Sequence, residues 1–152
     1  MIGTADRTMV IERVIKAPVA TVWGAWMNAE TLPQWWGPDG YSCRTSRIDL
    51  RQGGEWVFDM IGPDGTVYPN HHRYTLIRPE ARIEYLLLRG ENGPMHADAW
   101  VNFADLGGRT KITLGMILNS QQDYEQVISS ARISTMPAGS RPSSAGAIWG
   151  KT

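Results

Sequence analysis

The chain is poor in cysteine and has no net charge. Cys43 is the only cysteine among 152 residues, and 15 lysines and arginines balance 15 aspartates and glutamates. A single thiol cannot form an intrachain disulfide or build a thiolate-rich metal site. Without a basic excess, the sequence gives no indication of binding to nucleic acid or to an anionic membrane. We expect a cytoplasmic protein, because the composition is compatible with a reducing compartment.

Long hydrophobic runs are also absent. The first twenty residues contain five charged side chains, and no apolar stretch reaches the length of a signal peptide or a membrane-spanning helix. We therefore expect no membrane span. The length fits one domain over residues 1–152, and a chain of this size can bury about 70% of the surface that its unfolded form exposes.

Phenylalanine is scarce and tryptophan is abundant, with two and seven residues respectively. Residues 31–38 place the adjacent Trp35 and Trp36 between a proline and a Gly-Pro break. Adjacent residues do not share one face of a helix. One indole is therefore expected to point into the protein, and the other to lie along a rim or to cover a second wall of a pocket.

The order of the elements predicts an α+β domain. A β-branched segment over 8–15 reads as a strand, and apolar residues at helical spacing predict a first short helix from Val19 to Met27. A second short helix is expected over 30–36. Turn signals then separate consecutive strands of one bent antiparallel sheet of about six or seven strands. These strands are expected over 42–50, 55–61, 67–77 with an interruption near Pro69, 82–88, 96–103 and 109–118.

The two short helices are too small to cover one face of such a sheet, so burial calls for a C-terminal helix. Residues 121–132 can be helical. Residues 136–146 contain two prolines, two glycines and three serines, which do not suit a long helix. We expect a short or irregular C-terminal helix followed by an atypical tail over 133–152.

Several segments together resemble a known family. They are VIKAP at 14–18, VWGAW at 22–26, LPQWWGP at 32–38, DLRQGG at 49–54, GPDG at 62–65, FAD at 103–105 and RT at 109–110. They resemble the START-like (SRPBCC) helix-grip superfamily. Within it, they resemble the homologues of the activator of the 90-kilodalton heat-shock protein ATPase, from about Thr8 to Tyr124.

The resemblance implies a helix-grip fold with an internal cavity between the sheet and the helices. It also implies two kinds of partner: a small hydrophobic or amphipathic molecule, and a chaperone or another protein. The family closes its sheet with a long C-terminal helix, from which this chain departs after about Ile128. A changed reading frame is one hypothesis for that departure. If the tail is native, a second copy of the chain is a candidate to cover the sheet in place of a long C-terminal helix.

Metal and acid–base motifs are weak. His71 and His72 are adjacent in a predicted strand, so their side chains point to opposite faces and cannot chelate one ion, even with His96 as a third candidate. One of the two is a candidate polar group for the pocket. Four carboxylates are assigned to the solvent-exposed outer face: Asp59, Glu84, Asp98 and Asp105. We expect no metal, no cofactor and no catalytic residue.

Aromatic side chains are the candidate ligand-binding residues. They either fill the core or line the cavity that the resemblance implies. Which face of the 96–103 strand points inward stays open. The expected function is non-catalytic binding of a small hydrophobic or amphipathic ligand. The alternatives are a chaperone-associated interaction module and, less favoured, a cyclase- or dehydratase-type enzyme, which would need a buried histidine or carboxylate with a perturbed pKa beside Tyr74 or Tyr85. The candidates are Trp23, Trp36, Trp56, Phe58, Tyr74, Tyr85 and Trp100.

Overall fold

A single antiparallel sheet of seven strands dominates the computed structural model, which describes residues 7–120 and 122. The strand order is β1-β7-β6-β5-β4-β3-β2, so that β1 and β2 form the two edges. Each strand from β2 to β7 pairs with the next one along the chain. The strands are β1 (Thr8–Ile15), β2 (Ser42–Asp49), β3 (Glu55–Ile61), β4 (Val67–Arg78), β5 (Arg82–Leu88), β6 (Met95–Asp105) and β7 (Thr110–Leu118).

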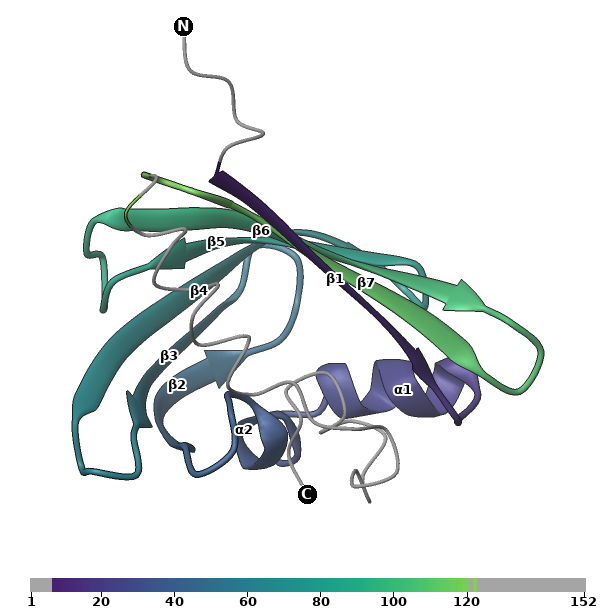
Figure 1. The fold of residues 1–152 in the computed structure, drawn as a ribbon, viewed down its shortest axis with the longest axis horizontal. Coiled ribbons are helices and arrows are strands. Elements are labelled where there is room, and N and C mark those ends of the chain that lie inside the picture. Colours follow the sequence, from purple (N-terminus) through teal and green to yellow (C-terminus); the bar gives the residue numbers. More distant parts are fainter. Residues whose placement is uncertain (1–6, 121, 123–152) are drawn as a thin grey trace, which may run out of the picture.

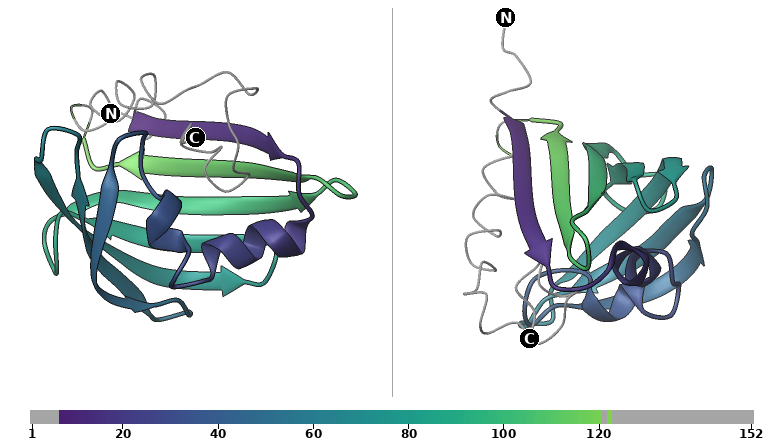
Figure 2. Two further views of the ribbon diagram at one scale, coloured as in Figure 1. Left: turned by 90° about the horizontal axis from the view of Figure 1, so that it is seen from below. Right: turned by 90° about the vertical axis from the view of Figure 1, so that its right-hand side faces the viewer.

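Two short helices connect the edge strands β1 and β2. They are α1 (Val19–Trp26) and α2 (Leu32–Trp35). Figure 1 shows the sheet curving around them, and both helices lie across its concave side in the views of Figure 2. The expected α+β helix-grip fold with one bent antiparallel sheet is confirmed.

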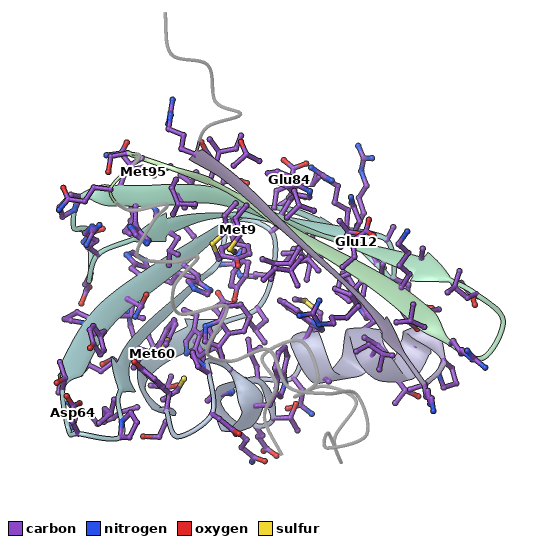
Figure 3. All side chains as sticks on the ribbon, in the orientation of Figure 1. Met9, Glu12, Met60, Asp64, Glu84 and Met95 are labelled. Atoms are coloured by element: carbon purple, nitrogen blue, oxygen red, sulfur yellow. The ribbon has the colours of Figure 1, made fainter. Side chains whose placement is uncertain are left out.

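The core lies between the concave face of the sheet and the two helices. The helix α1 buries Val22 and Trp26, which are four residues apart and therefore share a face. The strands contribute alternate residues, as a pleated strand requires. In Figure 3, Met9 and Met60 lie on the concave side, whereas Glu84 lies on the convex side. The predicted inward parity of Trp56, Phe58 and Met60 is confirmed, because the first two are in the core and Met60 packs against it.

One local prediction is wrong, and one alternative of another is excluded. The strand β4 continues through Pro69, which pairs with Asp59 in unbroken register. Pairing of β4 with β5 begins only at His71, so Pro69 lies where the strand has one neighbour, and there a missing N–H is tolerated. For the tryptophan pair, the rim position is excluded, because Trp35 and Trp36 are both buried. The helix α2 ends between them, and the extended backbone at Trp36 frees its ring from the helical constraint.

The expected C-terminal helix over 121–132 and the tail over 133–152 lie, except for residue 122, outside the described residues. Within those described, no helix is long and apolar enough to cross a membrane.

Candidate functional site

Aromatic rings surround the side chain of His72 on the concave face of the sheet. The strands β3, β4 and β5 supply most of them, and the residue that follows α2 closes the set from the helical side. Register brings these residues together: Trp56 is paired with His72, and Tyr74 with Tyr85. We call this set the His72 ring cluster; it consists of Trp36, Trp56, Phe58, His72, Tyr74 and Tyr85.

The rings of the cluster contact one another. The imidazole of His72 stacks on the Tyr85 ring, with 4.6 Å between centroids and 30° between planes. Four other rings present an edge or a face to it at angles of 75° to 86°, a favourable aromatic geometry. Their centroids lie 5.2 Å (Trp36), 5.3 Å (Trp56), 5.1 Å (Phe58) and 6.2 Å (Tyr74) from that of His72.

Burial keeps the His72 imidazole neutral. Its side chain is 2% exposed, and loss of hydration lowers its pKa to about 3, with a smaller contribution from neighbouring His71. A neutral imidazole has one donor and one acceptor nitrogen, so His72 brings both functions into an aromatic environment.

The hydroxyl of Tyr85 is the second polar group of the cluster. It is buried, and among residues 7–120 and 122 nothing hydrogen-bonds it. Burial raises the pKa of Tyr85 above its ordinary value, and burial with a contribution from Tyr85 does the same for Tyr74. Both phenols are therefore protonated near neutral pH. A buried hydroxyl without a partner is unusual, because most buried polar groups are paired.

The indole N–H groups next to the cluster differ in their partners. Trp56 donates to the hydroxyl of Thr45 across 3.0 Å, and Trp35 donates to the carbonyl of Ala25 across 3.3 Å. The Trp26 indole N–H is buried and has no partner within the described segments. Trp35 and Trp56 are thus hydrogen-bonded within the fold, whereas the buried polar atoms of Trp26 and Tyr85 have no partner among the described residues.

The structure brings together five of the seven predicted ligand-binding residues: Trp36, Trp56, Phe58, Tyr74 and Tyr85. Trp23 is half-buried on α1 and contacts Phe103, with 5.1 Å between ring centroids, instead of the cluster. Trp100 does not point inward. It covers Gly115 on the convex face and lies 5.9 Å from the guanidinium of Arg82, because the inward positions of β6 belong to Ala97, Ala99, Val101 and Phe103.

Two residues of this region escaped the sequence prediction, Trp26 and Phe103, and His72 was predicted only as one of a histidine pair that supplies a polar group. His72 is two residues from Tyr74 on one strand, so period-2 alternation already placed both on one face. Trp26 follows Trp23 by three residues on α1 and contacts both Trp35 and Trp36, at 5.0 and 5.4 Å between centroids. No sequence pattern marked Phe103, because the pattern of β6 did not show which of its faces points inward.

His71 lies on the opposite face of β4 and has separate partners. Its Nδ1 accepts the backbone N–H of Asn92 at 3.1 Å, and its Nε2–H donates to a Glu55 carboxylate oxygen at 2.8 Å. The prediction that His71 and His72 do not chelate one ion agrees with this arrangement. The described residues contain no group of three or more potential metal ligands.

The carboxylates assigned to the outer face form surface ion pairs or remain exposed. Asp59 pairs with Arg44 at 2.8 Å, and Glu84 pairs with Arg82 at 2.6 Å. Asp98 and Asp105 are exposed. None of these four lies in the core, so the His72 ring cluster contains no ionised carboxylate.

The seven-stranded sheet that curves around two short helices, with an aromatic core between them, defines an α+β protein of the helix-grip class. The sequence model of the Activator of Hsp90 ATPase homolog 1-like protein family (AHSA1) matches residues 16–137. The chain belongs to this family. No curated protein sequence matches the chain.

Solved structures of bacterial proteins share the fold. A protein from Mycobacterium smegmatis is 23% identical, with a TM-score of 0.72 over 86% of this chain and 84% of the other. A protein from Nitrosomonas europaea is 24% identical, with a TM-score of 0.70 over 85% and 86% of the two chains. An AHSA1-like protein from Aeromonas hydrophila is 21% identical, with a TM-score of 0.65 over 80% and 82%. At this level of identity, the likeness concerns the fold alone.

Proposed function

We propose that this protein binds a small hydrophobic or amphipathic molecule between the sheet and its helices, without chemical conversion. The observation that supports this is the His72 ring cluster, an aromatic environment that contains a neutral imidazole and a phenol whose hydroxyl has no partner among the described residues. Ligand sites of small molecules are mostly apolar and aromatic, with a few well-placed polar groups. We further propose that residues 1–152 form one START-like domain and that it works in the cytoplasm.

The composition of the core favours an apolar ligand. Among the described residues, the buried polar or charged ones are His71, His72 and Thr110. His71 is hydrogen-bonded to the Glu55 carboxylate and to the backbone N–H of Asn92, and the Thr110 hydroxyl donates to the carbonyl of Ala17 at 2.9 Å. The hydroxyl of Tyr85, the indole N–H of Trp26 and the imidazole of His72 are therefore the polar groups that we propose to orient a molecule otherwise held by apolar contacts.

Binding of an environment-sensitive apolar dye tests the proposal. We expect saturable binding of about one dye per chain by the wild-type protein, with competition from members of a lipid and aromatic panel. Trp56→Phe removes ring area inside the cluster and is expected to lower the affinity for the dye. Trp100→Phe makes the same chemical change on the convex face and is expected to leave that affinity unchanged. Circular dichroism checks that both variants fold. Absence of saturable binding across the whole panel would overturn the proposal.

An enzyme of the cyclase or dehydratase kind is the second candidate function. The specific observation in its favour is His72, a buried histidine whose pKa is strongly lowered and whose ring stacks on Tyr85. Strongly perturbed groups gather at catalytic sites. Incubation of the protein with each bound aromatic or polyketide-like molecule, followed by mass spectrometry, tests this function. Recovery of every molecule unchanged would remove it.

A chaperone-associated role is the third candidate, and its support is the family description, which names the activator of the Hsp90 ATPase. It predicts that the protein co-purifies with such a chaperone and stimulates its ATP turnover. Failure of both measurements would remove this role and would leave the ligand-binding proposal untouched.

A further inference from the structure

We propose that Asn92 is a site of slow deamidation and that His71 sets the rate of this modification by holding the turn in which Asn92 lies. Deamidation converts the side-chain amide into a carboxylate and releases ammonia. The inference is independent of the proposed ligand-binding function, because His71 and its partners lie on the opposite face of β4 from the His72 ring cluster.

The sequence around Asn92 favours this reaction. The chain has five asparagines, at positions 28, 70, 92, 102 and 119, and only Asn92 precedes a glycine. In deamidation, the backbone nitrogen of the following residue attacks the side-chain carbonyl carbon, so a following residue without a Cβ atom hinders the approach least. Asn92 is also exposed, so solvent can supply the base and the water that the reaction needs.

The reaction consumes only water and releases only ammonia. The N–H of Gly93 loses its proton to solvent base, and the nitrogen forms a bond to Cγ of Asn92. The Cγ–Nδ2 bond breaks and ammonia leaves, which closes a five-membered imide between side chain and main chain. Water then opens the imide. Attack at the side-chain carbonyl gives aspartate, and attack at the main-chain carbonyl gives isoaspartate.

The folded turn opposes closure of the imide. The N–H of Gly93 donates to the carbonyl of Gly90 at 2.9 Å, so the attacking nitrogen is already engaged. The N–H of Asn92 donates to Nδ1 of His71 at 3.1 Å, and Asn92 has a positive φ of 54°. A turn with a positive φ at its third residue favours glycine or asparagine, so asparagine suits this position. Deamidation therefore waits for local opening of the turn.

His71 is the buried anchor of this turn. Its side chain is held on the other side by Glu55, whose carboxylate oxygen accepts the Nε2–H at 2.8 Å. The second anchor is the ion pair between Arg47 and Glu91, and both of these side chains are about half exposed. Exposed ion pairs contribute little, whereas a hydrogen bond to a buried group corresponds to a factor of about ten in an equilibrium. The population of the open turn should therefore depend mainly on His71.

Peptide mapping by mass spectrometry tests the inference on the full-length protein after incubation at mildly alkaline pH and physiological temperature. We expect Asn92 to gain the mass of deamidation first, while the other four asparagines stay unchanged and serve as internal controls. The same measurement in concentrated urea gives the rate without the turn. We expect that rate to be at least about tenfold higher, because the hydrogen bonds that oppose closure are absent.

Two substitutions of His71 isolate its acceptor. His71→Ala removes the acceptor, and we expect deamidation of the folded protein to accelerate at least about tenfold. His71→Asn places an oxygen at about the position of Nδ1, and we expect it to keep most of the protection. His72→Phe changes the adjacent residue on the opposite face and is expected to leave the rate unchanged. Circular dichroism checks that the variants fold; if His71→Ala does not, His71→Asn and the ratio between folded and unfolded wild-type protein still decide.

The outcomes test the site and its control separately. Deamidation of another asparagine before Asn92 would overturn the site, and so would an intact Asn92 in the folded protein when the unfolded chain is fully converted. Equal rates in folded and unfolded wild-type protein, or in wild-type protein and His71→Ala, would overturn the control by His71. Equal acceleration in His71→Ala and His72→Phe would assign the effect to a general loss of stability and would overturn that control too. None of these results bears on dye binding, which tests the proposed function.

Discussion

At the scale of single residues, His72 makes stability depend on pH. Its pKa falls from 6.5 to about 3 on folding, so between these values the unfolded chain binds a proton that the folded chain does not. The free energy of unfolding therefore rises with pH in this window, and the stability is lost as the pH falls from 6.5. At pH 5 the loss is about 2 kcal/mol, from 1.36 kcal/mol for each pH unit.

His72→Phe tests this dependence, because a phenyl ring fits an aromatic environment and does not titrate. We expect the wild-type protein to lose stability between pH 7 and pH 5 and the variant to lose about 2 kcal/mol less, as measured by urea unfolding at each pH. Glu55, whose pKa is lowered mainly by its hydrogen bond to His71, adds a loss of the same sign, but only toward and below 4.5. Identical pH profiles for the two proteins would contradict the prediction.

Alanine substitutions at two glycines are expected to have opposite effects on stability. A Cβ atom on Gly115 would overlap the ring of Trp100, whereas a Cβ on Gly24 in α1 would meet nothing within 4 Å. We expect Gly115→Ala to destabilise the protein by about 1–3 kcal/mol through overpacking. We expect Gly24→Ala to stabilise it by about 0.4–1 kcal/mol, because alanine restricts the unfolded chain. Thermal unfolding of both variants checks this, and equal effects would show that Trp100 moves aside freely.

At the scale of elements, the turn between β5 and β6 is held to the convex face by side chains. The N–H of Asn92 donates to His71, and Glu91 forms an ion pair with Arg47 at 2.5 Å. Asn92 has a positive φ of 54°, which is uncommon for a residue other than glycine. His71 therefore fixes a turn whose backbone conformation is not intrinsically favoured.

His71→Ala is expected to release this turn. The Asn92 amide would lose its acceptor, so its hydrogen exchange is expected to accelerate at least about tenfold, the factor that corresponds to one hydrogen bond. His72→Phe changes the adjacent residue on the opposite face and is the control, with no expected change at Asn92. Hydrogen exchange followed by NMR measures both. Unchanged exchange at Asn92 in His71→Ala would show that His71 does not hold the turn.

The elements also show how far the sequence predicts the structure. Alternation of apolar and polar residues predicted the inward face of β3, since Trp56 and Phe58 differ clearly from Asp59. The strand β6 offers alanine, valine and phenylalanine on one face and a tryptophan on the other, so the pattern did not indicate that Trp100 points outward. Its position depends on Gly115, the residue paired with it on β7, and on Arg82 of β5. Neither contact is local in sequence.

The same limit applies to the candidate site. The sequence predicted five aromatic residues that the fold brings together, because large rings on buried strands must converge on the core. It also named the histidine pair as a source of one polar group. It did not place His72 at the centre of the rings, because the pairing of Trp56 with His72 depends on the register of β3 against β4.

At the scale of the whole molecule, the chain connects its two sheet edges through the helices, and β1 closes against the last strand, β7. Every residue of β1 from Thr8 to Ile15 has a partner in β7. At the end of this pairing, the fully buried Thr110 donates from its hydroxyl to the carbonyl of Ala17, just before α1. This one hydrogen bond joins segments 93 residues apart and positions α1 under the sheet.

Thr110→Val keeps the shape of the side chain and removes the donor, leaving the Ala17 carbonyl without this partner. We expect a loss of about 1–3 kcal/mol, the cost of an unsatisfied buried group, and a fall in melting temperature of several degrees, since about 1 kcal/mol corresponds to roughly 2–4 °C at this chain length. Thr75→Val is the matched control, because the exposed Thr75 hydroxyl donates to the carbonyl of Glu84 at 3.2 Å within neighbouring strands. Water can replace that bond, so Thr75→Val is expected to change stability by less than about 0.5 kcal/mol. Differential scanning calorimetry compares the two, and equal melting temperatures would show that β1–β7 pairing alone positions α1.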